Sequence, residues 1–292
     1  PNIVLFVADD LHRFDLGCYG AVNCKTPNID RLASEGIRMN QCYTAFTQCT
    51  PCRGELYTGL FPRRNGIIGN GIPAKPDVKG LPLHLRPLGY RTGLVGKNRV
   101  LGDPAIKVPS ITPYRDADPF DPQTQAFLEK KQAAEVQSVR NNGFDFAASI
   151  YAGNVPGHMP AAMEAHNMDW ITKGGLDFLD LAAKQDKPFY LHFCTTLHHG
   201  PGPAGHNYSV DPRFTAGGVL KKTPNVQPTR ESIIARLKAA GIEPVGDHAD
   251  ALWLDDGIGA LVTKLEQMGE LDNTLIFYFN DHGMDAKGAL YE

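Results

Sequence analysis

This 292-residue chain has no long apolar run, no excess of one charge and little cysteine. No apolar run approaches the roughly 18 residues that a helix needs to span a membrane, so we expect no membrane span. The 29 basic and 32 acidic residues give a net charge of −3, which argues against nucleic acid as a partner. Six cysteines are too few for a disulfide scaffold of this size. The composition, 42% hydrophobic and 21% charged, is that of a globular protein with a sizeable core.

Short strand-like segments alternate with helical patterns along the chain. The predicted strands are residues 2–8, 89–97, 189–197 and 275–279. Helical patterns lie at residues 26–36, 163–184, 231–240 and 249–268, the second of them interrupted by Gly174 and Gly175. This order predicts an α/β fold with a mainly parallel central sheet and helices on both faces. Residues 101–125, rich in Pro and Asp, are predicted to be a long irregular segment.

Charged side chains stand at the ends of the four predicted strands. In chain order they are Asp9 and Asp10, Lys97, His199, and Asp281 with His282. Ligands of open α/β sheets bind at the carboxyl ends of the strands, so we expect these side chains to meet. The pair after the first strand, Asp9 with Asp10, and the pair after the last strand, Asp281 with His282, offer mostly carboxylate donors. Carboxylates favour a hard cation such as Ca²⁺ or Mg²⁺. The alternative is that acids after a strand only cap helices or form turns.

Residues 49–59 contain the densest group of reactive side chains. Thr50 can cap a helix and Pro51 can start one, which would put Cys49 just before a helix N-terminus. Backbone N–H groups and the helix dipole favour an anion there, and Arg53 adds a fixed positive charge. Cys49 and Cys52 also form a C-x-x-C pair, so a redox pair and two plain buried cysteines remain as alternatives.

In this segment the chain resembles the formylglycine-dependent, type I sulfatases of the alkaline phosphatase superfamily. Cys49-Thr50-Pro51-Cys52-Arg53 matches their C-x-P-x-R motif. Further family motifs are matched in the same order by residues 2–10, 26–36, 96–97, 187–201, 272–283 and 287–292. The resemblance implies a sulfatase-like catalytic domain over residues 1–292 with an alkaline-phosphatase-like fold, which a smaller C-terminal subdomain would follow. Substrate-specificity loops are expected at residues 101–165 and 200–230.

The resemblance also implies a role for each motif residue. The family's motif cysteine is oxidised by a maturation enzyme to formylglycine, whose hydrate is the nucleophile, so Cys49 would be the modified residue. The implied ligands of Ca²⁺, with Mg²⁺ as an alternative ion, are Asp9, Asp10, the modified Cys49, Asp281 and His282. The other implied catalytic residues are Arg53, which supports the formylglycine, Lys97 and Lys287, which contact the sulfate and the leaving group, and His199 beside the reacting centre.

The sequence departs from the family pattern at several positions. Arg99 stands where members usually have a histidine that assists catalysis, and an arginine cannot shuttle a proton. It would bind an anionic substrate or form a structural salt bridge. His198 is a candidate substrate-binding residue or a wall residue. Cys52 replaces a frequent serine, and a disulfide between Cys49 and Cys52 would block maturation. The histidines without a motif, which we expect in loops or at the surface, are His12, His158, His166, His206 and His248.

Together these features predict hydrolysis of a sulfate ester, with a sulfated sugar preferred over a simple aryl sulfate. The expected partners are the sulfate ester and a formylglycine-generating maturation enzyme. A phosphonate monoester or phosphodiester hydrolase of the same fold is one alternative, because sulfate and phosphate esters share tetrahedral geometry. A catalytically inactive calcium- or glycan-binding module is another. The resemblance implies a periplasmic or extracellular location, which the residues themselves do not decide.

Overall fold

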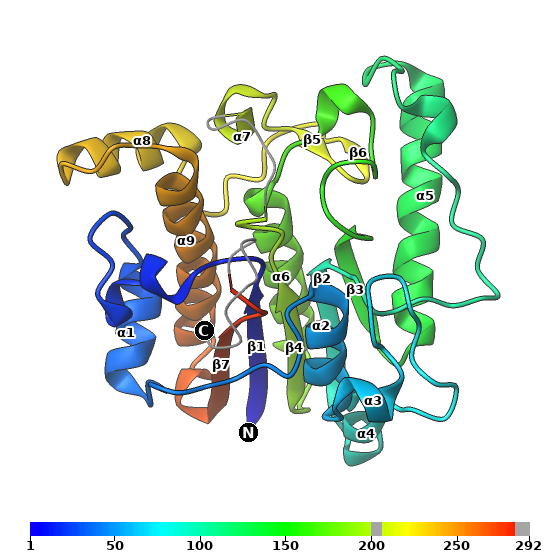
Figure 1. Cartoon of the computed structure of the whole chain (residues 1–292), viewed down its shortest axis with the longest axis horizontal. Helices are drawn as coiled ribbons and strands as arrows, with labels where there is room; N and C mark the ends of the chain where they lie inside the picture. The colour runs from blue at the N-terminus through cyan, green and yellow to red at the C-terminus, as the bar shows by residue number, and fades with distance from the viewer. Residues whose placement is uncertain (200–205, 284–292) are drawn as a thin grey trace.

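The computed structural model describes residues 1–199 and 206–283 and has a five-stranded sheet at its centre. The strand order is β3-β2-β4-β1-β7, and all neighbouring strands are parallel (Figure 1). The strands are β1 (Asn2–Ala8), β2 (Arg91–Lys97), β3 (Phe146–Tyr151), β4 (Phe189–Cys194) and β7 (Thr274–Asn280). A small antiparallel pair, β5 (Phe214–Thr215) and β6 (Gly218–Val219), lies outside this sheet. The predicted mainly parallel sheet is confirmed.

Helices cover both faces of the sheet, as predicted. The helices are α1 (Pro27–Glu35), α2 (Cys49–Thr58), α3 (Pro62–Asn65), α4 (Leu81–Leu85), α5 (Pro122–Asn141), α6 (Met168–Ala182), α7 (His206–Ser209), α8 (Arg230–Ala239) and α9 (Gly246–Gln267). Side chains of β1 alternate between two cores. Val4 and Phe6 join the core under α6 and α9, whereas Leu5 and Val7 join the core shared with α2 and α5. None of the helices in the described ranges is long and apolar enough to cross a membrane.

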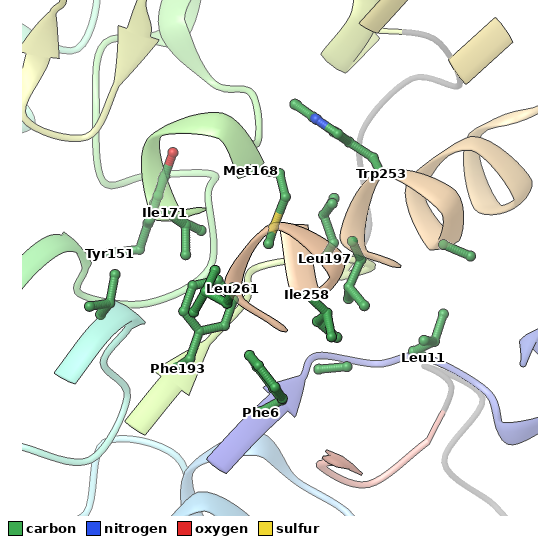
Figure 2. Close-up of a cluster of buried hydrophobic side chains, with 14 of the residues drawn as sticks. Phe6, Leu11, Tyr151, Met168, Ile171, Phe193, Leu197, Trp253, Ile258 and Leu261 are labelled. Carbon is green, nitrogen blue, oxygen red and sulfur yellow. The ribbon is translucent and has the colours of Figure 1, made fainter. Parts of the chain in front are cut away.

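The larger core forms where α6 and α9 pack on β1 and β4. Figure 2 shows Phe6 of β1 and Phe193 of β4 beside Leu261 and Ile258 of α9. The two phenylalanine rings meet edge to face, with centroids 5.5 Å apart. Trp253, also on α9, is completely buried. This packing fixes the strands whose carboxyl ends carry the predicted site.

Helix α6 continues through Gly174 and Gly175, so the predicted interruption is wrong. A Cβ atom at Gly174 would lie 2.8 Å from a methyl carbon of Val95 on β2. A Cβ atom at Gly175 would lie 2.9 Å from a methyl carbon of Leu261 on α9. The two glycines therefore allow α6 to pack closely against its neighbours, and this packing outweighs their low helix propensity.

Residues 101–165 contain more regular structure than the sequence pattern indicated. The irregular segment ends at Asp121, whose carboxylate accepts a hydrogen bond from the Thr124 N–H at 2.9 Å and so caps α5. Helix α5 then buries Leu128 and Val139, and β3 forms one edge of the sheet. The role of this region in substrate specificity remains a prediction.

The Asp255 side chain of α9 caps the start of α1, and we expect its removal to destabilise the protein. Its carboxylate accepts hydrogen bonds from the backbone N–H of Asn28 (3.1 Å) and of Ile29 (2.8 Å). Because Asp255→Ala leaves these donors unpaired, it should lower the free energy of unfolding in urea by about 1–3 kcal/mol. Asp180→Ala, which removes a surface ion pair with Lys264, is the control and should cost less than about 1 kcal/mol. Equal losses would contradict the capping role.

Candidate active site

The ends of β1 and β7 place three carboxylates together. Since β1 and β7 are paired in register up to Ala8 and Asn280, the acids that follow each strand are adjacent. The Asp10 N–H donates to the Asp281 carboxylate at 3.1 Å. Asp9, Asp10 and Asp281 are all buried. The predicted meeting of the two acidic strand ends is confirmed.

Two buried cations lie against these acids. Arg53 of α2 donates to Asp9 at 3.2 Å and to Asp281 at 3.1 Å. Lys97, at the end of β2, forms an ion pair with Asp9 and donates to the Asn154 side chain at 2.7 Å. Burial raises the pKa of Asp9, but Lys97 and Arg53 outweigh it and hold this pKa well below its usual range. Burial and the Asp9 charge raise the pKa of Asp281 to about 6.

Cys49 is the first residue of α2, and Gln48 is the N-cap. The prediction that Thr50 caps this helix and that Cys49 lies outside it is wrong by two positions. Pro51 fits inside the first turn because the N–H that it lacks would have no partner within the helix. The Cys49 thiol still lies at a helix N-terminus, where an anion is favoured.

The Cys49 sulfur lies within a compact group of possible metal ligands. It is 3.0 Å from Nε2 of His282. Asp9, Asp10, Cys49 and His282 are all buried, and each offers one ligand atom within 4.8 Å of the others. Burial raises the pKa of Cys49, but hydrogen bonds with His199 and His282 outweigh it and bring this pKa below its usual value. The Cys49 thiol is therefore more acidic than the Cys52 thiol, the other thiol of the motif.

This donor set fits a divalent cation. Three buried carboxylates, those of Asp9, Asp10 and Asp281, lie beside two permanent positive charges, those of Arg53 and Lys97. Burial lowers the pKa of His282, but hydrogen bonds with Asp10 and Cys49 outweigh it and raise this pKa to about 10, so the protonated ring pairs with Asp10 until a cation takes its place. Buried carboxylates are stable when they are paired or coordinate a metal. Oxygen-rich donors favour Ca²⁺ or Mg²⁺, and the imidazole of His282 adds a nitrogen donor. Four residues of the predicted ligand set, Asp9, Asp10, Cys49 and His282, thus lie together, and metal binding by this set stays a prediction.

Cys52 has a different environment from Cys49. Its thiol donates to the backbone carbonyl oxygen of Asp281, and both cysteines are free thiols. Burial raises the pKa of Cys52 above its usual value, so this thiol stays protonated and is a poor nucleophile. The motif cysteine suited to reaction is therefore Cys49.

The two histidines after β4 lie beside the acids. Nε2 of His199 is 3.3 Å from the Asp10 carboxylate. Burial lowers the pKa of His199, but Cys49 and the acids Asp9 and Asp10 raise it above its usual value. His198 is half-buried, and its backbone N–H donates to the carbonyl oxygen of Asp9. Lys287, the remaining predicted catalytic residue, lies outside the described residues.

His166 is a residue of this region that the sequence did not indicate. It lies in a loop before α6, as predicted, but it is buried rather than at the surface. Its Nε2 is 3.1 Å from the backbone carbonyl oxygen of His199, and its Nδ1 is 2.8 Å from the Thr196 hydroxyl. Since the carbonyl oxygen can only accept, Nε2 carries the proton and the ring accepts from Thr196. Burial lowers the pKa of His166 to about 3, consistent with a neutral ring.

We expect His166 to position His199. His166→Ala removes the hydrogen bond to the His199 carbonyl and should lower kcat about tenfold or more, with a smaller change in KM. His166→Gln, whose amide can donate to the same oxygen, should recover part of kcat. Steady-state kinetics of the three proteins tests this. Equal kcat values in the alanine variant and the unsubstituted protein would contradict it.

Arg99 forms no salt bridge within residues 1–199 and 206–283. It is half-buried, and its Nε is buried without a hydrogen-bond partner in those ranges. Arg99 lines a cavity of about 320 Å³ that also includes Thr50, the neighbour of Cys49. Arg99 therefore forms no structural salt bridge in these ranges, and its role in substrate binding stays a prediction.

Comparison with known proteins places this geometry in a family. The family model described as Sulfatase matches residues 1–291. The chain belongs to the sulfatase family. It is 28% identical over 315 residues to human arylsulfatase A, across 98% of this chain and 52% of that protein. It is 26% identical over 342 residues to the N-acetylglucosamine-6-O-sulfatase of Bacteroides thetaiotaomicron, across 100% of this chain and 61% of that protein.

The sulfatase fold is also seen in solved structures. Ps i-CgsB in complex with k-i-k-neocarrahexaose has a TM-score of 0.64 and 22% identity, covering 99% of this sulfatase chain and 60% of that one. The likeness supports the mainly parallel, alkaline-phosphatase-like architecture. The chain spans about half the length of the curated relatives that it matches.

Proposed function

We propose that this sulfatase-family protein hydrolyses a sulfate ester on a carbohydrate, releasing an alcohol and inorganic sulfate. A formylglycine derived from Cys49 would be the nucleophile, with calcium bound beside it. The observation that carries the proposal is the position of Cys49. It begins α2 within the C-x-P-x-R motif, and its sulfur lies in the buried group with Asp9, Asp10 and His282. The similarity to an N-acetylglucosamine-6-O-sulfatase supports a sulfated sugar as substrate.

Two groups would complete this site. Formylglycine, as its hydrate, would supply one hydroxyl that bonds to sulfur as the bond from sulfur to the alcohol oxygen breaks and the alcohol leaves with a proton. The second hydroxyl would lose its proton and expel sulfate, which leaves an aldehyde that water hydrates again. Calcium, held by Asp9, Asp10, Asp281, His282 and residue 49, would act as a Lewis acid toward the sulfate oxygens. The maturation enzyme that forms formylglycine is the protein partner that this mechanism requires.

The chain's own residues supply charge and proton transfer. The N-terminus of α2 favours negative charge at residue 49. Arg53 holds Asp9 and Asp281 in place through hydrogen bonds to both. Lys97, anchored by Asp9 and Asn154, keeps a positive charge beside the site for the sulfate. His199 is placed to transfer a proton to or from a reacting oxygen.

The test is sulfate release by protein whose Cys49 has been converted. Protein from its native host, or produced with a maturation enzyme, would be digested and the Cys49 peptide examined by mass spectrometry. The converted protein would then be screened on sulfated monosaccharides and oligosaccharides. An unmodified thiol in native-host protein would contradict the mechanism. No turnover despite formylglycine would favour a binding module, and a higher kcat/KM for a matched phosphate ester would favour a phosphodiesterase.

A further inference from the structure

Arg99 and His158 meet at one side of the active site, above Gly153. A Cβ atom at Gly153 would lie 2.5 Å from Nη1 of Arg99 and 2.6 Å from Nε2 of His158. The two nitrogens are therefore close enough to contact the oxygens of one anionic group. Asn154, the next residue along the chain, accepts a hydrogen bond from Lys97. This pair of donors thus lies immediately beside a predicted sulfate-binding residue.

The charge of Arg99 is not neutralised by a nearby carboxylate in the part of the chain that the structure describes. Glu135 lines the same cavity and forms a buried ion pair with Lys131 on α5 through Oε1, whereas its Oε2 is buried without a hydrogen-bond partner among the described residues. Asp103, also in the cavity lining, accepts from the Asn141 amide at 2.5 Å and from the Ala105 N–H. A half-buried guanidinium with a buried Nε and no acid partner favours an anionic ligand.

The cavity next to Arg99 can take a sugar. Its volume is about 320 Å³, within the range of small-molecule sites. Thr50, the residue that follows Cys49 in the chain, forms part of its wall. Ile72 and Val108 add apolar surface, and Ser138 adds a polar group. This mixture of polar and apolar lining suits a pyranose ring.

We propose that Arg99 and His158 form a second anion-binding position, so that the preferred sugar carries an oxyanion in addition to the sulfate that is cleaved. The second oxyanion is another sulfate or a carboxylate. This inference rests on the proposed function and narrows its substrate class. Arg99 supplies a planar fork of donors for a pair of oxygens, and His158 supplies a further nitrogen.

The first test compares substrates on converted protein. For the positional isomer that the protein cleaves, kcat/KM is measured with a monosulfated hexose, a disulfated hexose and a monosulfated hexuronic acid. We expect one of the two doubly charged sugars to exceed the monosulfated hexose by about 10- to 100-fold. A higher kcat/KM for the disulfated hexose identifies the second oxyanion as sulfate, and a higher kcat/KM for the monosulfated hexuronic acid identifies it as carboxylate. Equal values for all three would overturn the proposal.

Three variants test whether Arg99 and His158 cause the preference. Arg99→Gln should reduce the ratio of kcat/KM between the doubly and singly charged sugars to near one, and His158→Ala should reduce it in part. Gly153→Ala places a methyl group where the two nitrogens meet and should also reduce the ratio. Arg86→Gln is the matched control, because Arg86 pairs with Asp145 at the opposite, amino end of β3. A preserved ratio in Arg99→Gln protein would overturn the proposal.

A binding measurement separates this inference from the proposed function. Calorimetry with Cys49→Ser protein compares the affinities for the disulfated hexose, the monosulfated hexuronic acid and the monosulfated hexose without any turnover. A preference for a doubly charged sugar that Arg99→Gln removes would support the anion position even if no sulfate ester were hydrolysed. Equal affinities for the three sugars would overturn it even if sulfatase activity were found.

Discussion

Cys49→Ala is expected to lower kcat/KM for a sulfate ester by about 10⁵-fold in protein produced with a maturation enzyme. The expected loss is that of an enzyme that has lost its nucleophile. The groups clustered with its sulfur, those of Asp9, Asp10 and His282, are possible metal ligands, and none of them carries a hydroxyl or a thiol that could take its place. The measurement is sulfate release, with circular dichroism to show that the variant is folded.

Cys52→Ser is the matched control for this variant. A serine hydroxyl can donate to the same Asp281 carbonyl oxygen that accepts from the Cys52 thiol. We therefore expect Cys52→Ser to keep kcat/KM within about tenfold of the unsubstituted protein. The reverse pattern, with activity lost in Cys52→Ser and kept in Cys49→Ala, would show that the wrong cysteine has been assigned.

Arg53→Met should show the largest effect on stability, and this effect should depend on calcium. Methionine keeps an apolar stem but leaves Asp9 and Asp281 without the guanidinium that contacts both. Removing one partner of a buried charge network costs about 3–5 kcal/mol. In a chelator we expect a loss of that size in the free energy of unfolding. In excess calcium the loss should be smaller, because the cation would neutralise the same acids.

Urea unfolding in chelator and in calcium measures this difference. Lys264→Met, which removes the charge of a surface ion pair with Asp180, is the control and should change stability by less than about 1 kcal/mol in either condition. An equal loss for Arg53→Met with and without calcium would contradict the view that Asp9 and Asp281 hold the ion.

The sheet and most of the candidate site could be predicted because both depend on short sequence segments. Apolar strands ending in polar residues predicted β1, β4 and β7, and the carboxyl ends of parallel strands meet at one edge. The carboxylates of Asp9 and Asp281 were therefore expected to lie close together. Their shared contact with Arg53 shows why the motif arginine is buried.

What could not be predicted depends on contacts between distant segments. His166 contacts the backbone carbonyl oxygen of His199, and no side-chain pattern in the sequence reports such a contact. The continuity of α6 depends on what packs against Gly174 and Gly175 rather than on their propensity. That Arg99 forms no salt bridge within residues 1–199 and 206–283 could be seen only from the surroundings of its guanidinium, which lie on other segments.

During synthesis the site can form only after β7 has been made, because β7 pairs with β1 and carries Asp281 and His282 at its end. Cys49 and His282 are 233 residues apart in the chain, and both Asp281 and His282 come after β7. At about 5–20 residues per second, a ribosome needs roughly 10–50 s to pass from one to the other. During that interval the thiol is not yet enclosed by the last strand. The maturation enzyme that the proposed mechanism requires would therefore have its best access to Cys49 in the nascent chain, before β7 joins the sheet.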